Sequence, residues 1–431
     1  MKKFIYLLGI FFLFSSCEKY FGDVNIDPDQ PLDVPPSVIL GGVEGTLAYA
    51  YGGDLTRHAS IFTQHLTGVS RQWAVLQNYG IVGEDVNTVW GTNLYAGVLM
   101  ELKQLKTKSE ELGYKHYLGV AQVIEAYTLL LLTDNWNAVP YSEALNGVEN
   151  LQPAYDSQDA IYDSVFELLN TGRNNLNEAD GGALTPGGED LIFAGDIASW
   201  IGFANFIEAR AYLHLGAKDA ANYQNALDAI NAGALTADCA MAFSGGSTSN
   251  PMYQFNEQRG DCSIGSTIQT LVNDLNDPRR HLYDHAFDTD HPLLTTDRDV
   301  YLGTLAEQKF IEAECTFNIS GATAAHPLYL EAIELSMSAY GYADSTAAYV
   351  GQAEVDPGDA ALTLEHIMTQ KYIALFLDPE VFNDWRRTGF PVLTPNTGSS
   401  IPVRLPYPQK ELNLNPNVPS ATINTPVDWD I

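Results

Sequence analysis

The sequence predicts an all-α protein, built mainly of long helices. Apolar residues recur at helical spacing over several stretches, as they do on the buried side of a helix. No segment of comparable length alternates apolar and polar residues, so a large sheet is not expected. Three apolar stripes carry the prediction: Val120, Val123, Ile124, Tyr127 and Leu131; Ile197, Trp200, Ile201, Ala204, Ala211 and Leu215; and Leu364, Met368, Tyr372 and Leu375.

Further helices are expected along most of the chain. Helices of this length joined by short turns favour stacked pairs like those of tetratricopeptide repeats. The sequence has no clean repeat period, so this repeat character is inferred from helix pairing alone. We expect one extended helical domain over residues 37–431, with long irregular loops. The additional helices are expected near residues 43–66, 88–111, 156–177, 219–232, 300–316 and 326–340.

Two stretches interrupt the helical pattern. Residues 233–300 are rich in Gly, Ser, Thr, Asn and Asp, and residues 391–431 carry many Pro and Asn residues. Long loops in a compact protein are usually functional or disordered. We therefore expect an irregular insertion over approximately 233–300 on the ligand side of the domain.

The N-terminus has the features of a lipoprotein signal peptide over residues 1–16. The run 4–14 is apolar, follows two lysines and is separated from Cys17 by two serines. It is too short to span a bilayer as a helix, which takes about 20 residues. This order resembles a bacterial lipobox, so we expect acylated Cys17 to anchor an extended leader over 17–36. The alternative is an ordinary signal peptide with a nearby cysteine.

Charge and cysteine content narrow the classes of partner. The formal net charge is −32, which disfavours nucleic acid and anionic surfaces and suits a neutral ligand. Outside the cytoplasm, Cys239 and Cys262 could pair across a loop, an alternative the sequence leaves open. Cys315 lies in an apolar helical pattern and is expected to be a small buried side chain.

The chain lacks the usual signatures of catalysis, and we expect no cofactor and no metal. It contains no HExxH, GxSxG or GxxxxGK[ST] motif, and its nine histidines are scattered. The acidic run 23–29 begins like a calcium loop, but Pro28 replaces the expected Gly and Val34 the expected Glu. A glycosidase carboxylate pair cannot be seen from spacing alone, so a surface-anchored glycoside hydrolase is kept as an alternative.

Nine motifs in register resemble the SusD/RagB family of Bacteroidetes surface lipoproteins, and more narrowly its SusD-like branch. The resemblance covers nearly the whole chain after Cys17. The motifs are VNIDPDQP (24–31), LLTDNWNAVPYSEAL (131–145), PAYDSQDAIYDSVFELL (153–169), DLIFAGDIASWIGFANFIEARAYLHL (190–215), NDPRRHLYD (276–284), LAEQKFIEAEC (305–315), YLEAIELSMSAYG (329–341), QKYIALFLDPEVFNDWRRTGFP (370–391) and IPVRLPYPQKELNLNPN (401–417).

The resemblance implies a non-catalytic, nutrient-binding lipoprotein on the outer face of the outer membrane. Such a protein has helix pairs on one side and ligand-binding loops on the other. It caps a SusC-like, TonB-dependent transporter and helps to deliver an oligosaccharide or, in some members, a peptide. A helical-repeat adhesion protein without a small-molecule site is the remaining alternative.

Several residues in these motifs have a structural interpretation. Asn137 and Pro140 would turn the end of a helix into an extended segment. Trp136 is expected to pack at that corner. Asp277 is expected to cap the helical turn that begins after Asp277 itself. For Arg386 and Arg387 we favour the interpretation that one or both form bidentate pairs with internal carboxylates and fix the C-terminal segment, over recognition of an anionic ligand.

The ligand site is expected in two loops that mix aromatic and polar side chains. Neutral sugars need aromatic planes for their C–H faces and polar groups for their hydroxyls. The loop 68–90 corresponds in chain position to the family's ligand-facing region, and 250–261 to its pocket insertion. If Trp73 is an exposed platform, Trp73→Ala should weaken binding with little loss of melting temperature. The predicted ligand residues are Arg71, Trp73, Asn78, Tyr79, Tyr253 and Phe255, whereas Trp90 is expected in the core.

Overall fold

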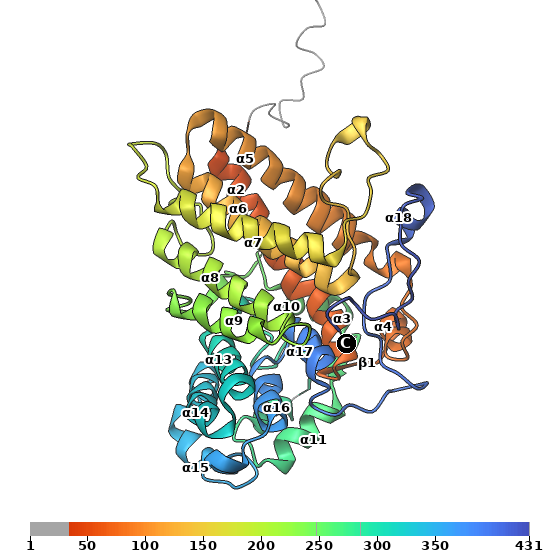
Figure 1. Cartoon of the computed structure of the whole chain (residues 1–431). Helices are drawn as coiled ribbons and strands as arrows, with labels where there is room; N and C mark the ends of the chain where they lie inside the picture. Colours follow the sequence, from red (N-terminus) through yellow and green to blue (C-terminus); the bar gives the residue numbers. More distant parts are fainter. Residues whose placement is uncertain (1–33, 247, 285, 431) are drawn as a thin grey trace, which may run out of the picture.

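The computed structural model describes residues 34–246, 248–284 and 286–430, and these form a mainly α-helical body (Figure 1). The predicted signal peptide, Cys17, the acidic run 23–29 and most of the leader lie outside the described residues. The chain enters the body at α2 (Pro36–Ala50), which continues through a π-helical turn, η1 (Tyr51–Leu55), into α3 (Thr56–Phe62). None of the described helices is long and apolar enough to cross a membrane.

Antiparallel helices stack down one side of the molecule, in the order of the sequence (Figure 1). The long π-helix η3 (Thr88–Met100) runs into α5 (Glu101–Leu112), which ends at Gly113 in the left-handed conformation. Ser157 caps α7 and Asp196 caps α8, each by accepting a backbone N–H. The helices that follow α5 are α6 (Lys115–Trp136), α7 (Gln158–Asn177), α8 (Ile197–His214) and α9 (Ala221–Asn231).

A second group of helices continues the stack below α9. Its first helix, α13 (Leu305–Ser320), is capped by Thr304 and packs against both α9 and α14 (Ala322–Ala339). Phe310 of α13 belongs to a small hydrophobic cluster of this group, whereas Ile311 belongs to the main core. The group also contains α15 (Thr346–Val350) and α16 (Leu364–Ala374), and the chain then forms α17 (Glu380–Thr388).

The helical predictions are confirmed, with corrections at the end of the first predicted helix and in and near the insertion. The helix expected to reach residue 66 ends at Phe62, and Leu66 begins strand β1 (Leu66–Gly68). Residues 300–303 form strand β4 (Val300–Gly303) instead of starting a helix. The insertion 233–300 is less irregular than expected because it contains strands β2 (Cys239–Met241) and β3 (Cys262–Ile264) and three helices. These helices are α10 (Pro251–Arg259), α11 (Ser266–Asp274) and α12 (Arg280–Tyr283).

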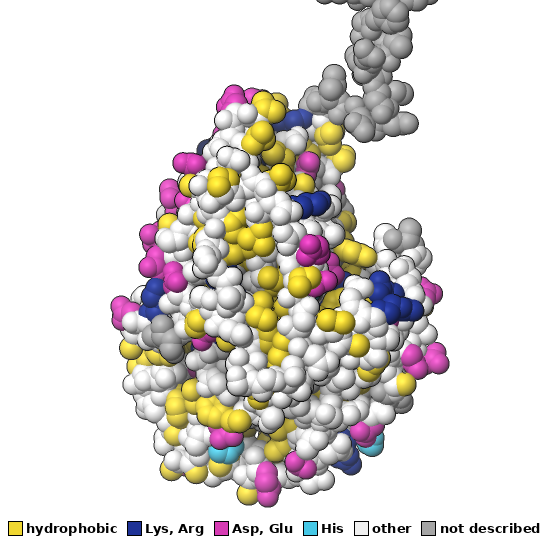
Figure 2. Space-filling view, turned by 90° about the vertical axis from the view of Figure 1, so that its right-hand side faces the viewer, with side chains coloured by type: hydrophobic (Ala, Val, Ile, Leu, Met, Phe, Trp, Pro, Cys, Tyr) yellow, Lys and Arg dark blue, Asp and Glu magenta, His cyan; other side chains and the backbone are white. Residues whose placement is uncertain are grey.

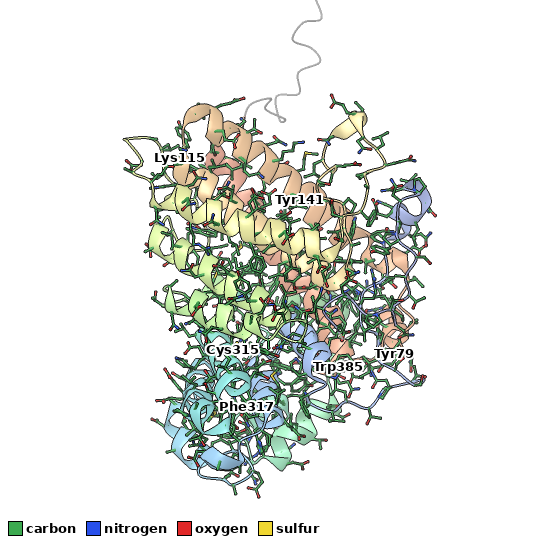
Figure 3. The ribbon with its side chains drawn as sticks, in the orientation of Figure 1. Tyr79, Lys115, Tyr141, Cys315, Phe317 and Trp385 are labelled. Carbon is green, nitrogen blue, oxygen red and sulfur yellow. The ribbon has the colours of Figure 1, made fainter. Side chains whose placement is uncertain are left out.

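Two small antiparallel sheets tie the insertion to the helical body. β1 (Leu66–Gly68) pairs with β3, and β2 pairs with β4. Cys239 and Cys262 therefore belong to different sheets, and both are free and buried, so the disulfide considered from the sequence does not form. Cys315 is buried in α13, as predicted (Figure 3).

The C-terminal segment after α17 is extended, apart from the short helix α18 (Gln409–Leu414). It crosses the body beside α3 and α4 (Arg71–Leu76), which lie on the side opposite the stacked helices (Figure 1). Leu405 donates its backbone N–H to the carbonyl of Asn135 at 3.0 Å. Trp136 is fully buried and donates its indole N–H to Pro406, and Asn137 has a φ of 69°, so the predicted corner is confirmed.

The two adjacent arginines have different partners. The prediction that one or both pair with internal carboxylates is confirmed for Arg387, whereas Arg386 contacts the C-terminal segment. Arg387 forms a bidentate pair with Glu314 of α13, at 2.7 and 3.0 Å, and both side chains are buried. Arg386 donates to the carbonyl of Val403 at 2.9 Å and lies over the ring of Trp429. Asp277 also has its expected capping role because it accepts the backbone N–H of Arg279 at 2.8 Å.

Candidate functional site

The β1–β3 ladder brings the two predicted ligand loops together. Gly68 at the end of β1 lies opposite Cys262 of β3, and the N–H of Val69 donates to the carbonyl of Asp261 at 2.8 Å. The next turn leads directly into α4, while α10 ends just before β3. A Cβ atom at Gly68 would lie 1.9 Å from the carbonyl oxygen of Trp73, so only glycine allows α4 to fold back this closely.

Asp261 joins the polar side chains of both loops. Its carboxylate accepts from Arg71 at 2.6 Å, from Arg259 at 2.8 Å and from the hydroxyl of Ser70. Burial disfavours its charge, but these hydrogen bonds and the two guanidinium groups outweigh burial and lower the pKa of Asp261. Arg259 also donates to Gln72 at 2.9 Å. The carboxylate therefore holds Arg71 and Arg259 in fixed positions.

Trp73 and Phe255, predicted in separate loops, are in contact. Their rings lie 5.3 Å apart in an edge-to-face arrangement, and the Arg57 guanidinium lies 4.4 Å from the ring of Phe255 and 5.4 Å from that of Trp73. Trp73 is only 4% exposed. The sequence suggests an open aromatic plane here, but Arg57 of α3 and Phe255 of α10 cover the indole. Trp73 therefore supports this surface from below.

The far end of α4 connects to the C-terminal segment. Tyr79 is half-buried against Phe62, has a φ of 62°, and its hydroxyl accepts the backbone N–H of Asn396 at 2.8 Å. Figure 3 places Tyr79 at the edge of the molecule. Asn78 is exposed and donates to the carbonyl of Ala74 at 3.0 Å, which leaves its carbonyl oxygen available.

Tyr253 lies in the first turn of α10, whose N-terminus is capped by Asn250. The Asn250 carbonyl oxygen accepts the N–H groups of Met252 and Tyr253 at 2.9 and 3.2 Å. The Tyr253 ring is half-buried. Neither Tyr253 nor Asn78 is joined to the other predicted ligand residues by a hydrogen bond, ion pair or ring contact in the described part of the chain. Trp90 is buried, as predicted.

The surface above this framework combines hydrogen-bonding groups with apolar patches. The side chain of Arg71 is 57% exposed, and Gln72 and Asn78 are also exposed. Val69 and Val75 present apolar side chains beside them. Figure 2 shows this side of the molecule, with hydrophobic side chains down its middle and acidic ones mainly toward its edges. Such a surface can hydrogen-bond hydroxyl groups and cover apolar C–H faces.

Three contributors to this site carry no clear signal in the sequence. Asp261 follows Arg259 closely enough to suggest an ion pair, but its link to Arg71 depends on the β1–β3 ladder. Arg57 lies in α3, before the first loop, and Asn396 lies in the C-terminal segment, so both are outside the two loops. The described residues contain no group of three or more acidic, His or Cys side chains that could hold a metal ion.

One family model matches almost all of the body. It is the SusD-like model described as "Starch-binding associating with outer membrane", and it matches residues 28–292 and 286–408. No curated protein matches the chain in sequence.

Solved structures share the fold over the whole body. A chitin-binding protein is 23% identical, with a TM-score of 0.78, and the match covers 92% of this chain and 100% of that protein. A SusD/RagB family protein from Bacteroides thetaiotaomicron is 23% identical, with a TM-score of 0.75 and coverage of 92% and 99%. A chitin-binding SusD homolog from Flavobacterium johnsoniae is 20% identical, with a TM-score of 0.77 and coverage of 91% and 99%.

Proposed function

The chain belongs to the SusD-like family, and from this premise we propose that it is a non-catalytic glycan-binding lipoprotein of the outer membrane surface. Acylated Cys17 would hold it there, with the helical body outside the bilayer. A SusC-like, TonB-dependent transporter would receive the ligand. The protein's affinity must be moderate because a ligand that dissociates too slowly would not be passed on.

The observation that carries this proposal is that the β1–β3 ladder joins the two loops into one surface whose polar side chains are held in place by hydrogen bonds. Asp261 fixes Arg71 and Arg259, and Asn396 fixes Tyr79, so little ordering is required when a ligand binds. Arg71, Asn78, Tyr79 and Tyr253 are the proposed ligand contacts. Trp73 and Phe255 would act mainly as the packed support beneath them.

A neutral glycan suits this surface better than a charged ligand. The net charge of −32 opposes anions, and the two guanidinium groups oppose cations at the site itself. The family description names starch, and two proteins of the same fold are chitin-binding. We therefore propose maltooligosaccharides and chitooligosaccharides as the first ligands to examine.

A hydrolase at this surface would need a carboxylic acid that can donate a proton. Asp261 is unsuited to that role because its pKa is lowered and both oxygens accept hydrogen bonds from cationic or hydroxyl groups. Incubation with the same oligosaccharides should therefore release no new reducing ends. Release of reducing ends that persists through purification would favour the hydrolase alternative.

The binding proposal is tested by calorimetry on the full chain carrying Cys17→Ser, which prevents acylation. Arg71→Ala and Tyr253→Ala should each weaken binding of the recognised oligosaccharide about tenfold or more, as expected for central contacts. The melting temperature should change little because Arg71 is largely exposed and Tyr253 half-buried.

Lys115→Ala serves as the matched control because Lys115 is an exposed cation remote from both loops (Figure 3). It should leave the affinity unchanged. The proposal is overturned if no maltooligosaccharide, chitooligosaccharide or other glycan on an array binds. It is also overturned if the Arg71→Ala and Tyr253→Ala proteins bind the oligosaccharide as tightly as the protein without these substitutions.

A further inference from the structure

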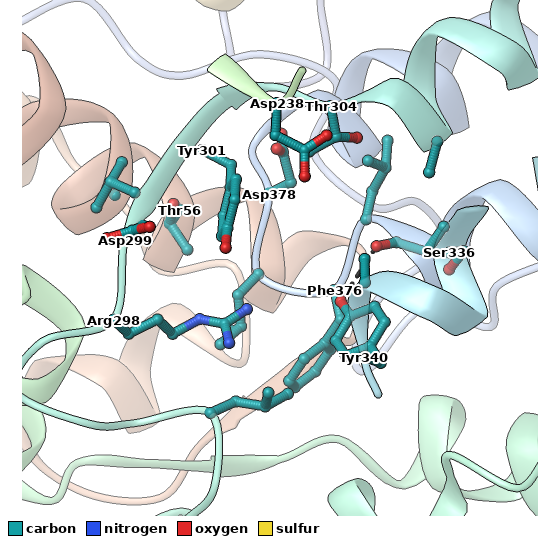
Figure 4. Close-up of a pocket in the computed structure, with 18 of the residues that line it drawn as sticks. Thr56, Asp238, Arg298, Asp299, Tyr301, Thr304, Ser336, Tyr340, Phe376 and Asp378 are labelled. Carbon is teal, nitrogen blue, oxygen red and sulfur yellow. Dashed lines mark hydrogen bonds between the residues drawn. The ribbon is translucent and has the colours of Figure 1, made fainter. Parts of the chain in front are cut away.

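A separate cavity of about 350 Å³ lies behind the two loops (Figure 4). Its walls come mainly from η1 and the start of α3, the segment 298–306 containing β4, the end of α14, and residues 374–378. Asp238, Leu293 and residues at the start of α10 complete the lining. Its volume lies within the roughly 300–1,000 Å³ of small-molecule sites. Met252 of α10 and the capping residue Asn250 line it, whereas Phe255 of the same helix packs on Trp73. The cavity and the candidate surface are thus neighbours that share α10.

Aromatic rings form part of the cavity wall. Tyr301 projects from β4, and Tyr340 and Phe376 lie together on the opposite side (Figure 4). The Tyr340 hydroxyl donates to the carbonyl of Ala374 at 3.1 Å, which fixes that ring. These rings offer the apolar faces on which the C–H surface of a sugar can stack.

Two polar groups that line the cavity have no hydrogen-bond partner among the residues that the structure describes. Within the described chain, neither the Arg298 guanidinium nor the Tyr301 hydroxyl makes a hydrogen bond, and Arg298 also makes no ion pair or cation–π contact. Figure 4 shows both groups directed into the same space. Both side chains are half-buried, so their polar groups remain accessible and can form hydrogen bonds with a polar ligand in this cavity.

Carboxylates supply the acceptors. Asp238, Asp299 and Asp378 line the cavity, and Arg298 is the one cation among the described lining residues. Asp238 and Asp378 are held in place by the backbone N–H groups of Leu305 and Glu380, each at 2.8 Å. This excess of acidic groups opposes an anion, whereas hydroxyl groups can donate to carboxylates and accept from Arg298.

The cavity is formed before any ligand arrives. The Tyr51 hydroxyl donates to Asp378 at 2.7 Å, which joins η1 to the segment 374–378. A Cβ atom at Gly52 would lie 2.5 Å from a methyl carbon of Val300, so η1 and β4 pack in close contact. Short π-helical turns such as η1 often occur at functional sites.

We propose that this cavity is a second saccharide site, which binds one or two neutral sugar units through Arg298, Tyr301 and the surrounding carboxylates. The inference rests on the proposed glycan-binding function and adds a concave site to its surface site. A short oligosaccharide, or the end of a longer chain, would occupy it.

The test uses maltose and N,N′-diacetylchitobiose with the full chain carrying Cys17→Ser. We expect at least one of these two disaccharides to bind. Its affinity should fall about tenfold or more in Arg298→Met, because this substitution removes the unpaired donors. Ser338→Trp, at an exposed position on the rim, should block binding by filling the cavity without disturbing the core. Arg280→Met is the matched control, since Arg280 bonds the carbonyl of Asp277 and does not line the cavity.

Repeating the titration with Arg71→Ala separates this inference from the proposed function. The disaccharide should still bind to Arg71→Ala, although longer oligosaccharides bind more weakly. The inference is overturned if longer oligosaccharides bind but neither disaccharide does, or if Arg298→Met and Ser338→Trp leave disaccharide binding unchanged. Failure of every glycan at both sites would overturn the proposed function as well.

Discussion

In the candidate site, exposure decides more than residue type which of the predicted side chains a ligand can reach. Arg71 and Asn78 were predicted from the sequence and lie on the surface, where a ligand can reach them. Trp73 was predicted on the same grounds but is buried by Arg57 and Phe255. Local sequence indicates that aromatic and polar residues occur together. It does not indicate which ring a distant residue will cover.

Trp73→Ala should therefore destabilise the fold. Truncating a buried tryptophan costs about 3–5 kcal/mol through lost burial and the cavity left behind. Trp73 is 4% exposed and packs against Phe255, so we expect a loss of this size in the free energy of unfolding, measured with urea.

Val75→Ala provides the control on the same helix because Val75 is 56% exposed. Its effect should stay within about 0.5 kcal/mol. A Trp73→Ala protein as stable as Val75→Ala would mean that the indole is exposed in solution. The simpler expectation from the sequence, an open stacking platform, would then be correct.

Among the helices and strands, α17 shows how a sequence pattern can predict a tertiary contact. Two adjacent arginines in an acidic chain suggested internal pairing, and Arg387 indeed joins α17 to Glu314 of α13. Asp384 accepts from Arg387 and Lys371, which adds α16 to the same network. The partners themselves could not be predicted because many acidic residues were available.

Arg387→Met should cost about 3–5 kcal/mol of unfolding free energy, since it leaves a buried carboxylate without its cation. Arg387 and Glu314 have exposed side-chain fractions of only 4% and 1%. Adding Glu314→Gln to Arg387→Met should recover part of the loss. Lys218→Met, which breaks an exposed pair with Asp159, should cost no more than about 1 kcal/mol. Equal costs for Arg387→Met and Lys218→Met would contradict the structural role of α17.

Long helices were predictable because their apolar stripes repeat over many residues, as in α6 and α8. Strand β4 was not predicted because its few residues directly precede the apolar pattern of α13. The sequence pattern therefore indicated a single helix over both elements. The cavity could not be predicted from the sequence either, because its lining residues range from Tyr51 to Asp378 along the chain. Its existence depends on how several distant segments pack.

Across the whole molecule, His214 links the helical stack to the C-terminal segment. The imidazole of this α8 residue lies 3.1 Å from Asp134 of α6 and 2.6 Å from Glu380 of α17. Asp134 also accepts from the Tyr162 hydroxyl and from the Trp429 indole. Burial opposes the charge of the imidazole, but Glu380 and Asp134 outweigh it and raise the pKa of His214 from 6.5 to about 9.

A histidine whose pKa is higher in the folded state than in the unfolded state stabilises the fold. This stabilisation is fully present below the unfolded-state pKa and is lost as the pH rises through the folded-state pKa. The free energy of unfolding should therefore fall between pH 6.5 and about 9. The shift corresponds to a loss on the order of 3 kcal/mol. Burial, together with Asp190, also raises the pKa of Glu44 to about 10, which adds a slope of the same sign.

Urea unfolding at constant ionic strength, below pH 6.5 and above pH 9, measures the total fall. His214→Gln should reduce the fall because glutamine does not titrate, and Glu44→Gln should remove the separate contribution of Glu44. Titration of the His214 imidazole by NMR gives a second measurement that does not depend on the variant folding well. An imidazole that titrates near 6.5, or a fall that His214→Gln leaves unchanged, would show that this network does not hold a charged histidine.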